Sequence, residues 1–80
     1  MALQDAQNTR MVEREISRRY VDASGLDVRV INGVCYLRGR IRKLRTRPDI
    51  DLELECDIIR KILRQREGIR EVIWEVETVH

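Results

Sequence analysis

The sequence predicts a small α+β domain in which three strands form one mixed sheet and two helices pack on one face of it. Three observations carry this prediction. Apolar residues repeat at helical spacing near the N-terminus and again after Pro48. Between these stretches, two runs of alternating apolar and polar residues flank Asn32-Gly33, and a third alternating run follows Gly68. The expected order is therefore helix, strand, strand, helix, strand.

The length and composition are those of one domain. A chain of 80 residues can form a single core but has little room for a large catalytic cleft. Hydrophobic residues make up 42% of the chain and are regularly spaced, which argues against disorder. The charged residues nearly balance at a formal net charge of +2, whereas a dedicated nucleic-acid binder would be much more basic.

The first helix is expected to begin at Asn8, whose side chain can cap the helix N-terminus. Residues 1–7 are then a flexible N-terminus, and the folded domain spans residues 8–80. The apolar stripe of this helix recurs at a spacing of four residues and comprises Val12, Ile16 and Tyr20. The segment DASG, residues 22–25, ends the helix because its glycine can adopt a positive φ.

The hairpin is the clearest local feature of the sequence. Asn32 and Gly33 tolerate the positive φ angles of a type I′ turn, and taking them as the loop fixes the register of the two strands. Ile31 then faces Val34, and the pairing continues as far as Asp27 opposite Arg38. Alternation places a nearly pure apolar set on the core face: Leu26, Val28, Val30, Cys35, Leu37 and Ile41. The opposite face carries Asp27, Arg29, Ile31, Val34, Tyr36 and Arg38.

The second helix is expected from Pro48 to Glu67, because proline suits a first helical turn and Gly68 supplies a stop. Its core face comprises Leu52, Cys56, Ile59, Ile62 and Leu63. The last strand alternates, with Val72, Trp74, Val76 and Thr78 on one face. Because a helix connects this strand to the one before it, the two strands should run parallel through a right-handed crossover. Whether they are neighbours in the sheet is left open.

Several segments resemble the BON domain, a small bacterial module. The matching residues are Leu26-Asp27-Val28-Arg29-Val30, Asn32-Gly33-Val34, Leu37 and Gly39, with Gly68-Ile69 before Val72 as a second cluster. The resemblance runs from about Val12 to Val79. It implies the fold described above, no catalytic residues, and a role in binding phospholipid surfaces or in protein interaction and oligomerisation.

A basic segment lies between Arg38 and Arg47, and arginine is well suited to bidentate contacts with phosphate. Phospholipid headgroups are one possible ligand, and an RNA or DNA backbone is a less favoured one. The alternative is a solvated loop that pairs in part with Asp49, Asp51 and Glu53 nearby. The candidate anion-binding residues are Arg38, Arg40, Arg42, Lys43, Arg45 and Arg47.

Two apolar surfaces are candidates for protein contacts. One is the outer sheet face, where Arg29, Ile31, Val34 and Tyr36 gather, with Ile73 as a possible addition. The other is a stripe on the second helix formed by Ile50, Leu54 and Ile58, which could also pack under the preceding loop. A single tyrosine on the sheet face favours an oligomer contact over RNA stacking.

No metal site, cofactor or small-molecule substrate is expected, since Cys35, Cys56 and His80 lack ligand spacing and both thiols are predicted to be buried. With no N-terminal apolar run, a cytoplasmic location is expected. The sequence therefore predicts a non-catalytic module, not an enzyme, that self-associates or docks on a partner protein. The alternative is an anionic-surface binder that uses residues 38–47.

Overall fold

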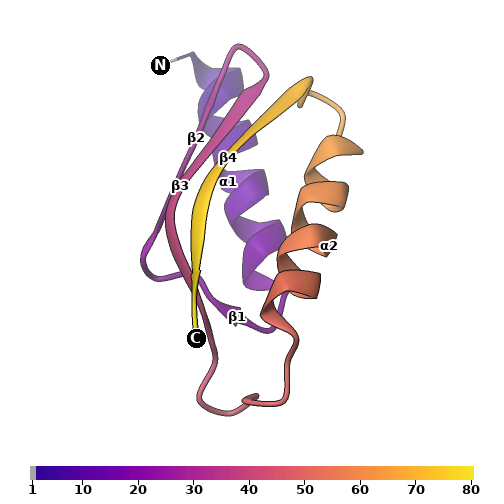
Figure 1. The fold of residues 1–80 in the computed structure, drawn as a ribbon. Helices are drawn as coiled ribbons and strands as arrows, with labels where there is room; N and C mark the ends of the chain where they lie inside the picture. The colour runs from indigo at the N-terminus through magenta and orange to yellow at the C-terminus, as the bar shows by residue number, and fades with distance from the viewer. Residues whose placement is uncertain (1) are drawn as a thin grey trace.

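Two helices cover one face of a single sheet and leave the other face open (Figure 1). The structure is a computed structural model and describes residues 2–80. Its elements are α1 (Leu3–Ser17), β1 (Val21–Asp22), β2 (Leu26–Ile31), β3 (Val34–Lys43), α2 (Leu52–Arg64) and β4 (Glu71–Val79). The predicted α+β class, with both helices on one face of a mixed sheet, is confirmed.

Strand β3 is the centre of the sheet. β2 pairs with it antiparallel along one edge, and β4 pairs with it parallel along the other. This arrangement answers the question that the sequence left open, because β3 and β4 are neighbours. Arg42 of β3 pairs with Val79 of β4 and also with Asp22 of β1, so β1 lies on the edge that β2 occupies. The short strand β1 is one strand more than the sequence predicted.

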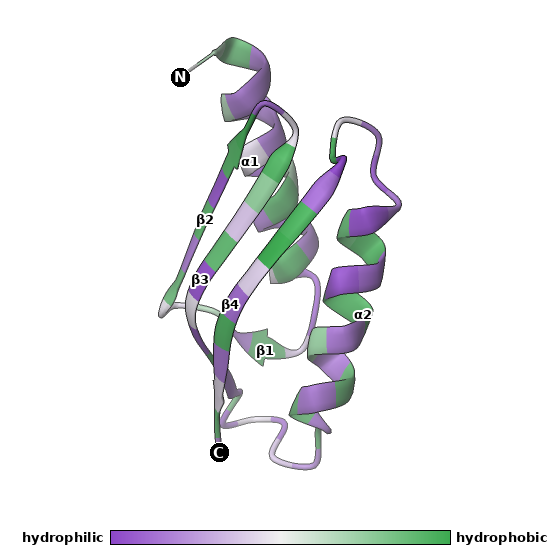
Figure 2. Ribbon diagram, turned by 45° about the horizontal axis from the view of Figure 1, so that its top comes forward, coloured by the Kyte–Doolittle hydropathy of each residue, from purple (hydrophilic) through white to green (hydrophobic). Residues whose placement is uncertain are grey.

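The hairpin has the predicted register. Ile31 is opposite Val34, and the pairing continues to Asp27 opposite Arg38. Asn32 has a φ of 50° and Gly33 a φ of 79°, so both loop residues adopt the left-handed conformation that a type I′ turn requires. Figure 2 shows the resulting alternation of apolar and polar positions along the strands.

The core lies between the sheet and the helices. Burying each large aliphatic side chain stabilises the fold by roughly 1.5–3 kcal/mol. Trp74 packs against the edge of this core and is only half-buried. The fully buried side chains come from every layer: Val12, Val30, Cys35, Leu37, Ile41, Leu52, Cys56, Ile59 and Leu63.

Helix α1 begins earlier than predicted. It starts at Leu3, so Asn8 lies inside the helix and is buried, and the predicted cap at Asn8 is wrong. Residues 3–7, which were expected to be flexible, are helical, while Met1 lies outside the described residues. The helix has no side-chain cap at Ala2, so the usual start signal is missing. On the N-terminal side of Val12, the buried face of the helix consists of polar residues, and a search for apolar repeats does not detect them.

Two other boundaries also differ. Helix α1 ends at Ser17, so Tyr20 lies outside it and residues 22–25 form part of the β1 region instead of a helix stop. Helix α2 begins at Leu52 instead of Pro48, because the Asp51 carboxylate accepts a hydrogen bond from Leu54 N at 3.1 Å and caps the helix there. It ends at Arg64, short of the predicted Glu67.

Candidate functional site

The outer face of the sheet is not covered by any element in residues 2–80 (Figures 1 and 2). The register places Ile31 beside Val34, and Tyr36 between Arg29 and Ile73. Ile31 is 45% exposed and Tyr36 is 43% exposed, although both are large hydrophobic residues. We call this cluster the outer patch; it comprises Ile31, Val34, Tyr36 and Ile73.

Next to the outer patch, acidic residues of the neighbouring strands flank the basic residues of β3. Arg38 lies between Asp27 of β2 and Glu75 of β4 in the register. Arg40 lies beside Glu77, with 3.9 Å between Arg40 Nε and Glu77 Oε2. These acids come from strands far away in sequence, and not from the acidic stretch after Pro48. This half of the basic segment is therefore balanced by acids on the sheet.

The other half of the basic segment lies at the end of β3 and in the loop that follows. Lys43 Nζ donates a hydrogen bond to the Pro48 carbonyl at 3.3 Å. Arg47 Nε is 3.6 Å from Asp49 Oδ1, and the Arg47 guanidinium lies over the Tyr20 ring at 4.5 Å. Cation–π contacts of this kind hold a guanidinium in place.

Only Arg40 and Arg47 of the basic segment have a carboxylate at ion-pair distance within residues 2–80. Arg38 has acids beside it in the register and Lys43 has the Pro48 carbonyl, whereas Arg45 has no such partner among the described residues. Arg42 does face Asp22, whose pKa is lowered mainly by hydrogen bonds from Ser24 and further by the charge of Arg42. The candidate anion-binding residues thus do not form one continuous surface, and the least compensated positive charge is at Arg45.

The predicted helical stripe of Ile50, Leu54 and Ile58 does not form as a helical surface. Ile50 precedes α2 and is half-buried, because the helix starts only at Leu52. Ile58 is also half-buried, while Leu54 is 54% exposed. A single exposed leucine gives no basis for an interaction surface.

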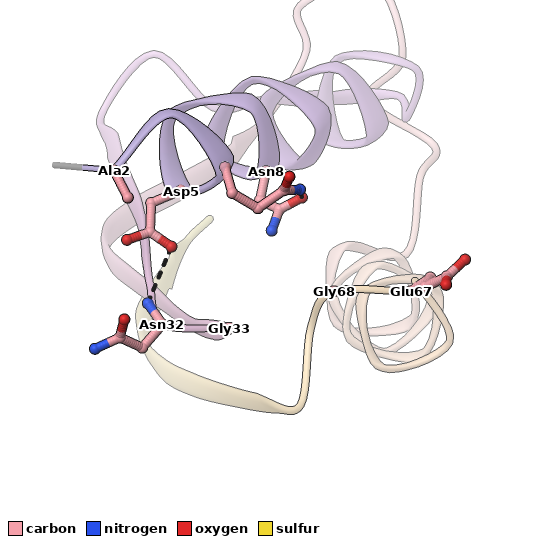
Figure 3. A pocket seen from close by; sticks show the side chains of 8 residues that line it. Ala2, Asp5, Asn8, Asn32, Gly33, Glu67 and Gly68 are labelled. Carbon is pink, nitrogen blue, oxygen red and sulfur yellow. Dashed lines mark hydrogen bonds between the residues drawn. The ribbon is translucent and has the colours of Figure 1, made fainter.

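A polar hollow of about 640 Å³ lies at the hairpin end of the molecule, between α1, the hairpin turn and the turn before β4 (Figure 3). Asp5 points toward the hairpin, and its Oδ1 accepts a hydrogen bond from Asn32 N at 3.0 Å. Asn8 points toward the Gly68 turn, whereas Glu67 points away. No group of acids, cysteines or histidines suited to a metal ion occurs in the described part of the chain. The hollow's one inward carboxylate serves the fold by holding the hairpin.

A second polar contact that the sequence did not suggest is buried between α1 and α2. Arg19 Nη2 lies 2.6 Å and 3.0 Å from the two carboxylate oxygens of Glu55, which is only 5% exposed. Glu55 stands three residues after Leu52 and four before Ile59, so its position at the edge of the helix core face was the available signal. The pair links the chain after α1 to α2.

Both cysteines are buried, as predicted. Cys35 is fully buried and Cys56 is 2% exposed. Burial raises the pKa of each thiol to about 11. The thiols are therefore neutral at physiological pH and behave as small hydrophobic side chains.

Comparisons with known proteins give no family for this chain: no family model matches it, and no match is found among the curated proteins. The resemblance to the BON domain therefore stays a prediction. Within the described residues, neither helix has the length and apolar character needed to cross a bilayer.

Proposed function

We propose that this domain is a non-catalytic binding module that contacts another protein through the outer patch, with a second copy of the chain as the first partner to test. One observation carries the proposal: Ile31 and Tyr36 stand at diagonal positions on two paired strands, on the same uncovered sheet face, and are nearly half exposed. Tyrosine and aliphatic residues that are grouped in this way are typical of the centre of a protein interface.

The charges around the outer patch are consistent with a second copy as partner. A two-fold contact brings the same surface together with itself, so the surface must carry groups of both signs. Here Arg29 and Arg38 stand on the same face as Asp27 and Glu75. The BON resemblance implies interaction and oligomerisation and agrees with this function, and a cytoplasmic setting remains part of the proposal.

Light scattering across a range of protein concentrations tests the proposal. The average mass of the unmodified chain should rise toward that of a dimer, and the double variant Ile31→Ser/Tyr36→Ser should stay monomeric. Leu54→Ser is the matched control, because it removes a similarly exposed hydrophobic side chain away from the sheet. If the unmodified chain remains monomeric at the highest concentration, self-association through this face is ruled out.

A second candidate function is binding to an anionic lipid surface, and it rests on Arg42 and Arg45, two basic residues without an ion pair at the end of β3 and in the loop after it. Vesicles with anionic lipid should bind the chain at low salt, whereas purely zwitterionic vesicles should not. Arg42→Ser/Arg45→Ser should abolish this binding, and Lys61→Ser/Arg64→Ser on α2 is the control of equal charge change. The candidate is wrong if anionic vesicles leave the chain free at low salt.

A further inference from the structure

The β2 edge of the sheet is closed by side chains of α1. Thr9 Oγ1 accepts a hydrogen bond from Val30 N at 3.0 Å, and Asp5 Oδ1 accepts one from Asn32 N. At the other end of the strand, Leu26 N donates to the Ala23 carbonyl at 3.0 Å. An incoming strand would find few free amides along this edge.

The β4 edge is open. The two-residue hairpin makes Ile31 and Val34 a hydrogen-bonded pair, so even-numbered residues of β3 direct their backbone groups toward β2 and odd-numbered residues direct theirs toward β4. Because Cys35 is the register partner of Val72, the odd-numbered residues of β4 direct their backbone groups toward β3. The even-numbered residues direct theirs away from the sheet, and none of these outward amides finds an acceptor within residues 2–80. The outward amides belong to Val72, Trp74, Val76 and Thr78.

The open edge is acidic on the outer face of the sheet. Glu71, Glu75 and Glu77 project on this face, and β4 itself contains no lysine or arginine. The helix side is mixed: the Arg60 guanidinium lies over the Trp74 ring at 4.8 Å, and Glu53 of α2 accepts a hydrogen bond from Thr78 Oγ1 at 2.6 Å at the end of the strand. A strand that pairs with this edge must therefore place its outer side chains beside carboxylates.

A second copy of β4 does not fit this edge. In an antiparallel pair centred on Glu75, that residue stands opposite its own copy. If the register shifts by two residues in one direction, Glu77 stands opposite Glu71. If it shifts by two residues in the other direction, Glu77 stands opposite Glu75. Like charges directly across two strands are destabilising. Self-pairing through the edge is thus disfavoured in the registers that overlap most of the strand.

The strand that already pairs with β4 shows which side chains fit beside it. Along the paired edge of β4, β3 places Arg38 beside Glu75 and Arg40 beside Glu77, so basic residues stand at every second position. We propose that the free edge of β4 binds an extended, basic segment of a partner protein, which joins the sheet as a further strand. The outward amides and carbonyls of β4 supply the backbone hydrogen bonds, and lysine or arginine at alternate positions contacts Glu71, Glu75 and Glu77.

This inference goes beyond the proposed function, because it uses the strand edge and not the outer patch. The probe is a capped peptide, Lys-Thr-Lys-Thr-Lys-Thr-Lys, added to the whole chain and followed by amide NMR. Hydrogen exchange should slow at the outward amides of Trp74, Val76 and Thr78, and binding should weaken as salt is added. A peptide of the same composition, Lys-Lys-Lys-Lys-Thr-Thr-Thr, is the control, because it has the same charge without the alternation.

Variants of the chain separate charge from backbone pairing. Glu75→Gln/Glu77→Gln should weaken binding of the alternating peptide by roughly threefold to tenfold, the size expected for two cross-strand charge pairs. Glu13→Gln/Glu67→Gln removes the same charge from exposed positions elsewhere and should change nothing. Val76→Pro removes one outward amide and leaves the amides that bond β3 in place, so it should also weaken binding.

The outcomes divide clearly. Slower exchange at the outward amides with the alternating peptide alone supports strand addition, whether or not Val76→Pro folds. Equal binding of both peptides, exchange changes elsewhere than at β4, or no binding at low salt overturns it, as does pairing of two β4 edges without peptide. Ile31→Ser/Tyr36→Ser should bind the alternating peptide normally, so failure of the outer-patch proposal is distinguishable from failure of this one.

Discussion

Helices α1 and α2 pack on the same face of the sheet but are held there by different interactions. The buried face of α2 is apolar except for Glu55, whereas half of the buried face of α1 is polar. In its first turns, α1 is attached to the hairpin by hydrogen bonds that Asp5 and Thr9 accept from the amides of Asn32 and Val30. Hydrophobic burial is tolerant of small shifts, but hydrogen bonds fix position. We infer that α2 supplies most of the stability and that α1 fixes the hairpin.

The largest expected effect is in the core under α2. Leu63 is fully buried, so Leu63→Ala removes buried methyl groups and leaves a cavity. This change should lower the free energy of unfolding by about 2–5 kcal/mol, a large part of the 5–15 kcal/mol typical of a domain. Urea denaturation measures it, with the exposed Leu54→Ala as control. Equal losses in the two variants would contradict the assignment of stability to the α2 core.

The next effect is at the ion pair between the two helices. Glu55→Ala leaves Arg19 without its partner, and Arg19 Nε already has no hydrogen bond within the described residues. Because the Arg19 side chain is 28% exposed, water compensates in part, and we expect a loss of about 1–3 kcal/mol. The double variant Arg19→Met/Glu55→Leu should recover most of it in thermal unfolding. No recovery would show that the pair matters for more than charge balance.

A smaller effect is expected where α1 holds the hairpin. Thr9→Val keeps the shape of the side chain but removes the acceptor for Val30 N, at a cost of about 1 kcal/mol. Hydrogen exchange at the Val30 amide should become faster, while amides in the middle of α2 should change only through global stability. Gln7→Ala on the exposed side of α1 is the control. If hydrogen exchange became equally faster in both helices, the different roles of α1 and α2 would be contradicted.

The smallest effect is pH-dependent and concerns Glu15. A hydrogen bond from Arg66 at 2.6 Å holds the pKa of Glu15 below its ordinary value, and the charge of Arg18 adds to this. A lowered folded-state pKa means that the contribution is present above the unfolded pKa and is lost as the pH falls through the folded one. Glu15→Gln should cost about 0.2–1 kcal/mol at neutral pH, because Arg66 is 44% exposed.

Unfolding measured from neutral to acidic pH checks this prediction. The difference in stability between the unmodified chain and Glu15→Gln should shrink steadily as the pH falls. A difference that stays constant in acid would mean that the glutamate acts by packing and not by charge. Glu13→Gln, which carries the same change at an exposed position two residues away, is the control.

The difference between the helices also explains what the sequence could predict. The hairpin register followed from Asn32-Gly33 and strict alternation, and the core face of α2 followed from its apolar repeat. The start of α1 could not be predicted, because Asp5 and Asn8 are buried for their hydrogen bonds and look like surface residues in sequence. Strand β1 is too short to produce a period of its own.

The candidate surfaces were predictable to a similar degree. Ile31, Val34 and Tyr36 share a face by local alternation, and the sequence placed them together. The place of Ile73 and the acids beside Arg38 and Arg40 depend on β4 lying next to β3. That adjacency is a property of the whole chain and cannot be read from any one segment. The balance of the basic segment by Glu75 and Glu77 was therefore missed.

The contact between two turns at the hairpin end has a consequence for how the domain can change over evolution. A Cβ on Gly33 would lie 3.1 Å from the Gly68 carbonyl, so at Gly33 the hairpin turn is in direct contact with the turn before β4. An inserted residue in either turn would displace the other. In the loop after β3, Arg47 N donates to Leu44 O and Ile50 N donates to Arg47 O, so these backbone hydrogen bonds join residues of the loop itself, and doubling its length costs only about 0.6 kcal/mol in closure entropy. Length variation among descendants of this chain should therefore accumulate between Leu44 and Asp51.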